Sequence, residues 1–224
     1  MTEIIKNTKY QKHINGIVKN GNFKNKDNIF FTSDLHLFHN NILEYCNRPF
    51  KSIDAMTEGL IKNWNNKVPK NAEVYILGDL TMVGNEKYTK LNPVLKKLNG
   101  IKHLIMGNHD RISSVNYINA GIFSIHYPYL QLHNKYYMFH DPALSIACPE
   151  GSIILSGHVH NLFGKINIDD KKKIIIDVGV DSWDYKPVSL DVISLFVSEI
   201  KRLGKEKFKE NYKEINKKRE IEKL

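Results

Sequence analysis

The chain has 224 residues, of which 42% are hydrophobic and 25% charged, and this is enough apolar material for one substantial core. We expect a single domain over residues 1–224, since domains commonly hold about 100 to 200 residues. No uninterrupted apolar segment approaches the roughly 18 residues of a membrane span, and no basic stretch followed by an apolar run opens the chain. A cytoplasmic protein with no membrane partner is therefore expected.

The formal net charge of +9 comes from the two ends of the chain. Residues 1–28 carry six basic and two acidic groups, residues 201–224 carry ten and five, and residues 29–200 carry 17 of each sign. A basic tail can attract RNA, DNA or an acidic partner through counterion release. A run rich in Lys and Glu is more commonly a solvated helix face. Both interpretations stay open, but the neutral body argues against nucleic acid as its main partner.

The first half of the chain alternates short apolar runs with amphipathic segments. It follows a polar segment at residues 1–27, in which Tyr10, Ile14 and Ile17 keep a short helical spacing. Ser52 can cap the first predicted helix, and the second contains Pro93. Strands are predicted at residues 28–33, 74–77 and 102–106, and helices at 53–66 and 86–98. This alternation predicts parallel pairing within one sheet.

The second half begins with a short predicted helix at residues 113–119, after which the strand signals come closer together. Strands are predicted at residues 122–125, 129–132, 136–139, 152–155, 162–168 and 173–178. This pattern predicts a meander that faces the first sheet. A final helix over about residues 190–203 is expected to continue into a basic helical tail at about 204–224.

Side chains suited to metal binding follow the first two predicted strands. Asp34 and His36 come directly after the first strand, and residues two apart in extended backbone project from the same side. A carboxylate and an imidazole placed in this way can hold one ion. Asp79 follows the second strand after Gly78, which permits a sharp turn, and its two carboxylate oxygens are suited to bridge two cations.

The same placement recurs at three later strand ends. The residues concerned are Asn108, His109 and Asp110 after residues 102–106, His140 after 136–139, and His158 and His160 after 152–155. A single histidine is more commonly a core or surface residue than a ligand. Five such blocks in order can converge on one rim of a sheet, however, and together they predict a pocket for two divalent ions.

With these motifs, the chain resembles the calcineurin-like metallophosphoesterases over about residues 28–190. Residues 31–42 and 178–188 are also similar to a small bacterial and phage branch of predicted phosphoesterases. The resemblance implies a four-layer α/β/β/α sandwich, in which two mixed β-sheets are flanked by helices. The chain departs from the branch at Phe38, where a small residue is common, at Phe139, often a glycine, and at Asp177, usually an asparagine.

The resemblance also implies a role for each site residue. One ion would be held by Asp34, His36, Asp79 and His160, and the other by Asp79, Asn108, His140 and His158, with Asp79 as the bridge. His109 would contact phosphate or protonate the leaving oxygen, and Asp110 would orient its ring. Asn108 and His39 are expected to contact substrate. Arg48 is either a phosphate-binding fork or a surface arginine before Pro49.

Mixed oxygen and imidazole ligands suit manganese, iron, zinc, cobalt or nickel, and manganese is expected first. The predicted enzyme is a phosphoesterase that cleaves a phosphomonoester or phosphodiester, with a small nucleotide-like substrate and hydroxide activated at two metals as the nucleophile. A nuclease or RNA-end phosphoesterase that uses the basic termini is the first alternative. A catalytically silent metal-binding module is the second, although such proteins normally lack some of the ligands.

The remaining reactive or aromatic residues have weaker motif context. Trp183, Tyr185 and Lys186 could stack on a base or form a pocket wall, and packing is the more common role for Trp183. Cys46 and Cys148 are expected to be ordinary buried thiols, and four histidines are expected to be structural, namely His13, His103, His126 and His133.

Overall fold

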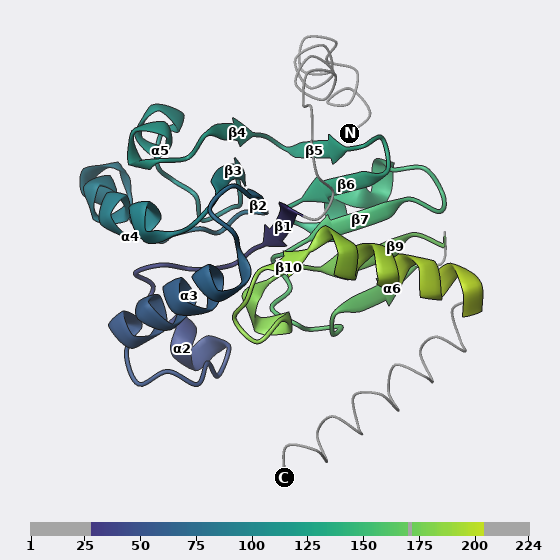
Figure 1. Ribbon diagram of the computed structural model, residues 1–224, viewed down its shortest axis with the longest axis horizontal. Helices are drawn as coiled ribbons and strands as arrows, with labels where there is room; N and C mark the ends of the chain where they lie inside the picture. The colour runs from purple at the N-terminus through teal and green to yellow at the C-terminus, as the bar shows by residue number, and fades with distance from the viewer. Residues whose placement is uncertain (1–27, 170–171, 204–224) are drawn as a thin grey trace. The chain divides into compact units, whose positions relative to one another are not determined.

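The computed structural model describes residues 28–169 and 172–203, and these ranges contain two five-stranded sheets. The strand order is β10-β1-β2-β3-β4 in the first sheet and β5-β6-β7-β9-β8 in the second (Figure 1). The strands are β1 (Ile29–Thr32), β2 (Glu73–Ile76), β3 (Ile101–Ile105), β4 (Ser124–His126), β5 (Tyr129–Leu132), β6 (Tyr136–Phe139), β7 (Ile153–Ser156), β8 (Ile166–Ile168), β9 (Ile174–Asp177) and β10 (Val188–Ser189). The predicted class, two mixed sheets with flanking helices, is confirmed.

Five α-helices and three 3-10 helices connect or follow these strands in the described residues. They are α2 (Ile42–Tyr45), α3 (Ile53–Lys67), η3 (Asn85–Lys90), α4 (Leu91–Lys97), α5 (Ser114–Ala120), η4 (Pro142–Ala147), η5 (Val180–Ser182) and α6 (Leu190–Leu203). The helical spacing predicted at residues 10–17 and the helical tail predicted at about 204–224 lie outside the described residues.

Strands β1 to β4 of the first sheet run parallel, and β10 pairs with β1 in the antiparallel direction. Parallel pairing was predicted for β1, β2 and β3, whereas the prediction that β4 belongs to the second sheet is wrong, because β4 pairs with β3. Helices α3, α4 and α5 lie on one side of this sheet (Figure 1). Alternate strand residues such as Val74, Ile76 and Leu104 are buried with the helices in one apolar core. The β-α-β connections thus leave the carboxyl ends of β1, β2 and β3 at one edge of the sheet.

Helix α3 shows how the local sequence builds this layer. The Ser52 side chain accepts a hydrogen bond from the Ala55 backbone N–H at 3.1 Å and caps the helix as predicted. Met56, Leu60 and Trp64 recur at helical spacing and are buried in the core. Burial of each side chain of this size stabilises the fold by roughly 1.5 to 3 kcal/mol.

The single helix predicted at residues 86–98 is wrong, because the segment divides into η3 and α4 at residue 91. The division places Pro93 in the first turn of α4. A proline there lacks only an N–H that would have no partner inside the helix, whereas deeper in a helix it would break a hydrogen bond. The proline therefore sets where the α-helix can begin.

The second sheet is mixed, and the predicted meander is wrong. Strands β6, β7 and β9 pair in parallel, and only the edge strands β5 and β8 are antiparallel to their neighbours. Parallel pairing requires long crossover connections, which residues 140–152 and 157–173 supply. The strand predicted at residues 162–168 shortens to β8, because a turn closed by the hydrogen bond from Gly164 N to Asn161 O precedes it.

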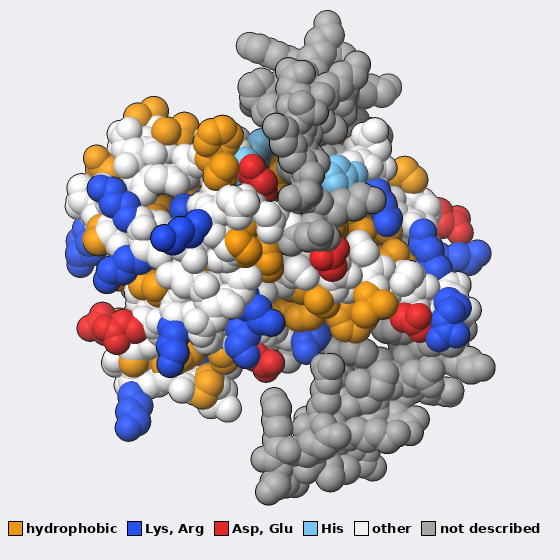
Figure 2. All heavy atoms as spheres, in the orientation of Figure 1, with side chains coloured by type: hydrophobic (Ala, Val, Ile, Leu, Met, Phe, Trp, Pro, Cys, Tyr) orange, Lys and Arg blue, Asp and Glu red, His pale blue; other side chains and the backbone are white. Residues whose placement is uncertain are grey.

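Helix α6 has the bounds predicted from the sequence and belongs to a unit of its own, since the chain divides after Leu190. Ile193, Val197 and Ile200 recur on it at the spacing of an apolar stripe. Among the described helices, none combines the length and the apolar composition needed to cross a bilayer. On the face drawn in Figure 2, basic and acidic side chains lie scattered among apolar and neutral ones.

Candidate metal centre

The backbone hydrogen bonds between β1 and β2 continue beyond the ends of both strands. Asp34 N donates to Gly78 O at 3.0 Å, and His36 N donates to Asp79 O at 2.9 Å. These hydrogen bonds join residues that are 44 and 43 positions apart in the sequence, and they hold the two blocks in register at the edge of the sheet. Asp34, His36 and Asp79 consequently lie together, as their positions at successive strand ends predict.

Five of the predicted ligands lie in the left-handed region of backbone conformation. The φ angles are 57° for Asp34, 49° for His36, 52° for Asp79, 71° for His158 and 44° for His160. Asp and His are enriched among the non-glycine residues that adopt this conformation, but it remains unfavourable. Each of these residues therefore makes a tight turn directly after its strand, which directs its side chain over the edge of the sheet.

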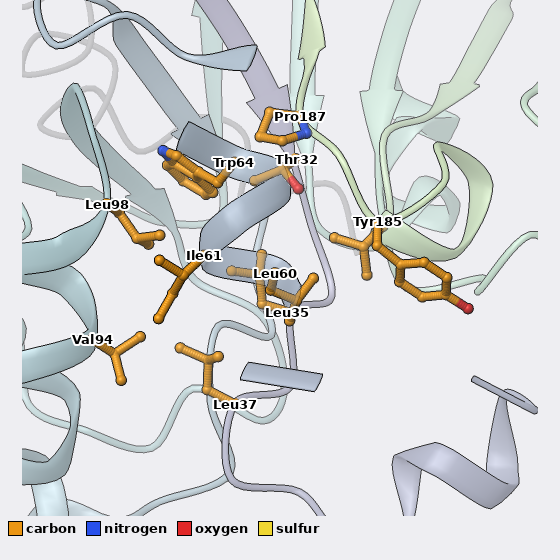
Figure 3. Close-up of a pocket in the computed structure, with 11 residues that line it drawn as sticks. Thr32, Leu35, Leu37, Leu60, Ile61, Trp64, Val94, Leu98, Tyr185 and Pro187 are labelled. Atoms are coloured by element: carbon orange, nitrogen blue, oxygen red, sulfur yellow. The ribbon is translucent and has the colours of Figure 1, made fainter. Parts of the chain in front are cut away.

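Side chains between the ligands project to the opposite side. Leu35 and Leu37 alternate with Asp34 and His36, and they line a small apolar cavity against Leu60 of α3 (Figure 3). Both leucines are almost fully buried. The residues that line this cavity include no carboxylate and no imidazole, so the cavity belongs to the core. The candidate ligands lie on the other side of this chain segment.

The first group of candidate ligands consists of Asp34, His36 and His160. One potential ligand atom from each lies within 4.8 Å of the others. The rings of His36 and His160 are 5.1 Å apart between centroids. A carboxylate and two imidazoles at this spacing fit one divalent transition-metal ion.

The second group consists of Asp79, His140 and His158, which satisfy the same 4.8 Å criterion. Nε2 of His140 lies 3.3 Å from Oδ2 of Asp79 and 2.9 Å from Oδ1 of Asn108. The amide oxygen of Asn108 therefore converges on the same point as the carboxylate and the imidazole. Nδ1 of His140 faces the carbonyl of Leu77 at 2.8 Å, which leaves Nε2 for an ion.

Asp79 joins the two groups. Its Oδ2 lies 3.5 Å from Nε2 of His36 in the first group and 3.3 Å from Nε2 of His140 in the second. Nε2 of His36 is buried and has no hydrogen-bond partner among the described residues. A buried nitrogen without a partner is costly, and a cation between His36 and Asp79 would satisfy it. The residues present therefore fit a pair of divalent ions.

Electrostatics favour cations at this position. Burial alone would lower the pKa of His140 and His160, but the surrounding carboxylates raise these values to about 9 and about 10. Burial raises the pKa of Asp34 to about 6, although His140 and His160 oppose that shift. The field that favours protons on the two histidines also favours metal cations, because both are positive charges.

Glycines in the motifs allow the strand ends to approach closely. A Cβ atom on Gly78, whose φ is 87°, would lie 2.5 Å from Nδ1 of His140. A Cβ atom on Gly157 would lie 2.3 Å from Oδ2 of Asp34 and closer still to the Ser33 hydroxyl. Any other residue at these positions would displace a candidate ligand.

His109 and His39 stand beside the two groups. The His109 backbone N–H donates to Oδ1 of Asp79 at 2.9 Å, and the ring Nε2 lies 4.0 Å from Oδ2 of the same carboxylate. The His109 side chain is 33% exposed, so it can meet a molecule from solvent. The half-buried His39 ring lies 5.3 Å from that of His36 and 6.4 Å from that of His109. The structure thus brings both residues to the site, as the sequence predicts.

Arg48 does not have the environment of a phosphate-binding residue. Its side chain is fully buried and forms a two-point ion pair with Asp181 at 2.8 Å. Its two terminal nitrogens also donate to the backbone carbonyls of Leu35 at 3.2 Å and Asp34 at 2.8 Å. The predicted fork is wrong, because these groups occupy its donors, and the alternative of a surface arginine is wrong as well.

Asp110 does not contact the His109 ring, so its predicted orienting role is not supported. Its Oδ2 accepts from the backbone N–H groups of Asp79 at 2.8 Å and Gly107 at 2.9 Å. Its Oδ1 accepts from Leu80 N at 3.0 Å and from the Tyr117 hydroxyl at 2.9 Å. Asp110 therefore fastens the turn after β2 to the turn after β3.

The sequence interpretation missed the roles of two buried carboxylates. Asp181 lies 2.8 Å from Nδ1 of His160, and Asp177 accepts from the backbone N–H groups of Asn161 at 3.0 Å and Gly179 at 2.7 Å. Asp177 thereby holds the turn that follows His160. Asp181 lies in the 178–188 segment, which is similar to the phage branch, and Asp177 directly precedes that segment at a position where the chain departs from the branch. This similarity carried no information about their partners.

Other expectations concern residues away from the two groups. Trp183 packs as expected, with its Nε1 donating to Asp177 O at 2.6 Å, and Tyr185 lines the apolar cavity (Figure 3). His103 and His126 share the hydroxyl of Ser124 at 2.6 Å and 2.8 Å and are structural. Cys46 and Cys148 are free thiols and only partly buried, which corrects the expectation of buried ones.

Comparisons with known proteins agree with the fold. The sequence model described as calcineurin-like phosphoesterase matches residues 28–186. The chain is 37% identical over 167 residues to an uncharacterized protein of Methanocaldococcus jannaschii, and the match covers 74% of this chain and 88% of that protein. It is 27% identical over 202 residues to the gene 66 protein of Mycobacterium phage D29, covering 77% and 97%. A solved structure of a protein of unknown function from Aquifex aeolicus is similar with a TM-score of 0.59 and 26% identity, covering 75% and 97%.

Proposed function

Because this chain belongs to the calcineurin-like phosphoesterase family and is a metallophosphoesterase, we propose that it hydrolyses a small, nucleotide-like phosphomonoester or phosphodiester at a two-ion centre. One observation carries the proposal. A single carboxylate oxygen, Oδ2 of Asp79, lies within 3.5 Å of an imidazole nitrogen from each of the two ligand groups. A bridging carboxylate between two such groups is what a pair of ions requires.

Asp34, His36, Asp79 and His160 would hold one ion, and Asp79, Asn108, His140 and His158 the other. Manganese is the proposed metal, and iron, zinc, cobalt and nickel suit the same ligands. The chemistry that the ions supply when bound is Lewis acidity, which lowers the pKa of water and offsets the charge of the phosphoryl oxygens. The protein contributes by keeping its ligands fixed at the edge of the sheet.

His109 is the proposed general acid. Its backbone N–H is fixed on Asp79, and its partly exposed ring presents Nε2 toward the same carboxylate. A proton on Nε2 can therefore pass to the leaving oxygen of a phosphoester that reaches Asp79. Positioned proton transfer of this kind typically contributes about 10²- to 10⁴-fold to the rate.

His39 and Asn108 are the proposed substrate contacts. Asn108 is exposed at the rim, and its oxygen faces Nε2 of His140. Burial and the positive field of His109 and Arg48 lower the pKa of His39, so its ring is mostly uncharged at neutral pH. A neutral imidazole can donate to a phosphoryl oxygen or accept from a leaving hydroxyl.

The proposal is tested with metal-free protein that is reconstituted with Mn²⁺. It is assayed on p-nitrophenyl phosphate, bis-p-nitrophenyl phosphate, cyclic nucleotides, dinucleotides and short RNA. Turnover that requires the metal is expected, with small substrates preferred. The His109→Ala variant should lose about 10²- to 10⁴-fold in kcat while it binds the same amount of Mn²⁺.

Three results would contradict part of the proposal. Two bound ions without turnover on any substrate would support a silent metal-binding module. A strong preference for RNA that weakens with salt would support the nuclease alternative. Unchanged kcat in His109→Ala would remove that residue from the catalytic set.

A further inference from the structure

Two side chains that bind no proposed ion converge on the first ligand group. Arg48 and Asp181 form an ion pair in which Nε meets Oδ1 and Nη2 meets Oδ2, both at 2.8 Å. Their side chains are 0% and 7% exposed. A buried ion pair is weak evidence for stability, because the loss of hydration offsets much of the attraction. The position of this pair beside the site points to a different role.

Each member of the pair contacts one candidate ligand of the first group. Asp181 Oδ2 lies 2.8 Å from Nδ1 of His160, and Arg48 Nη2 donates to the Asp34 backbone carbonyl at 2.8 Å. Because Nδ1 of His160 is engaged with the carboxylate, Nε2 is the ring nitrogen left to bind an ion. The pair thus acts on the ring orientation of one ligand and on the backbone position of another.

We infer that Arg48 and Asp181 are positioning residues for one ion of the pair. Asp181 fixes the tautomer and the ring plane of His160, while Arg48 fixes both Asp181 and the turn at Asp34. This inference rests on the proposed two-ion function. It predicts an asymmetric effect, since His140 in the second group faces a backbone carbonyl, that of Leu77, which no side-chain substitution removes.

A third ion is the competing explanation for this region. Cys46, His160 and Asp181 also bring potential ligand atoms within 4.8 Å of one another. However, both oxygens of Asp181 already accept from Arg48, and the guanidinium charge opposes a second cation at that distance. The three residues are therefore better explained as the surroundings of one imidazole, whose Nδ1 meets the Asp181 carboxylate.

The test is a Mn²⁺ titration of the full-length protein, followed by calorimetry and by electron paramagnetic resonance. In Asp181→Asn the affinity for one ion should fall by about 10- to 100-fold, the usual effect of losing a partner that orients a ligand. The affinity for the other ion should not change. Asp181→Glu, which keeps a carboxylate acceptor, should recover most of the loss.

Asp169→Asn is the matched control. This carboxylate pairs with the buried Lys173 at 3.9 Å and lies beyond β8, in a different part of the chain from the candidate ligands. Its removal disturbs a buried charge without touching either ligand group. Both ions should therefore bind Asp169→Asn as they bind the native protein.

The tautomer of His160 gives a measurement that needs no variant. In the native protein loaded with diamagnetic Zn²⁺, nitrogen-15 NMR should show a proton on Nδ1 of His160 and none on Nε2. A proton on Nε2, or full affinity for both ions in Asp181→Asn, would overturn the inference even if that variant is unstable. Failure of the native protein to bind two ions would instead overturn the proposed function.

Discussion

The two ligand groups are supported in different ways. In the first group, Nδ1 of His160 contacts the Asp181 carboxylate, which in turn accepts a hydrogen bond from Arg48. In the second group, Nδ1 of His140 contacts the backbone carbonyl of Leu77, directly after β2. One group therefore depends on side chains brought from distant parts of the sequence, and the other depends on the backbone of the sheet. Because a substitution can remove a supporting side chain but not a backbone carbonyl, two ion sites with similar ligands can differ in their tolerance to substitution.

Asp79→Asn should have the largest effect, because Asp79 is common to both groups. The amide keeps the size of the carboxylate but removes the charge between His36 and His140. We expect kcat/KM to fall by about 10³-fold or more, which corresponds to about 4 kcal/mol of lost transition-state stabilisation. Kinetics on p-nitrophenyl phosphate and metal content by mass spectrometry check this, and a variant that retains two ions and full activity would show that Asp79 is not the bridge.

His140→Ala and His160→Ala should each disrupt one ligand group and leave the other intact. Each variant should retain one bound ion instead of two. Activity should fall by more than the 10- to 100-fold that is typical when a residue that only orients a metal ligand is lost. The double variant should be little worse than either single one, because residues that act as a unit are not additive. Equilibrium dialysis with Mn²⁺ gives the stoichiometry. Additive losses in the double variant would mean that the two groups act independently.

Added Mn²⁺ should raise the melting temperature, because ions that bind only the folded state stabilise it. At a free concentration of 100 times Kd, one ion contributes about 2.7 kcal/mol. For a chain of this size, that corresponds to a shift of roughly 5 to 10 °C. Scanning calorimetry with and without chelator checks the shift, which should be smaller in His140→Ala and in His160→Ala. Equal shifts in native and variant proteins would place the ions elsewhere.

Tyr117→Phe should have the smallest effect. It removes one of the four donors to the buried Asp110, which holds the Asp79 and Gly107 turns together. Loss of a hydrogen bond to a charged group typically costs about 1.5 to 3 kcal/mol of stability, and activity should change by less than about tenfold. Urea denaturation measures the effect. Tyr45→Phe, at a residue 71% exposed, is the control and should change stability by no more than about 0.5 kcal/mol.

The candidate ligands could be located from sequence because their signal is local. A polar residue directly after an apolar run marks a strand end, and parallel strands bring their carboxyl ends together. The pairing of β7 with β9 could not be predicted in this way, because it depends on a crossover and not on the strands themselves. The parallel order of β1, β2 and β3 could be predicted, since helices alternate with strands there, but the place of β4 in the same sheet could not.

The contacts of the supporting residues could not be predicted from the sequence, for a related reason. Arg48 and Asp181 are 133 residues apart, and nothing local to either indicates the other. An arginine after a metal motif suggests phosphate binding until its burial is known. The same holds for Asp110, whose neighbour in sequence is His109 but whose partners are backbone groups of Asp79, Leu80 and Gly107.

The left-handed turns at Asp34, His36, Asp79, His158 and His160 have a consequence for how this chain can change over time. A non-glycine residue in that conformation costs roughly 1 to 2 kcal/mol. Glycine would relieve the backbone cost at these positions, but at Asp34 and Asp79 it would also remove the carboxylates that accept the backbone N–H groups of His158 and His109. Selection for thermal resistance alone would therefore not favour glycine at the two aspartates, whose carboxylates hold neighbouring turns as well as being candidate ligands.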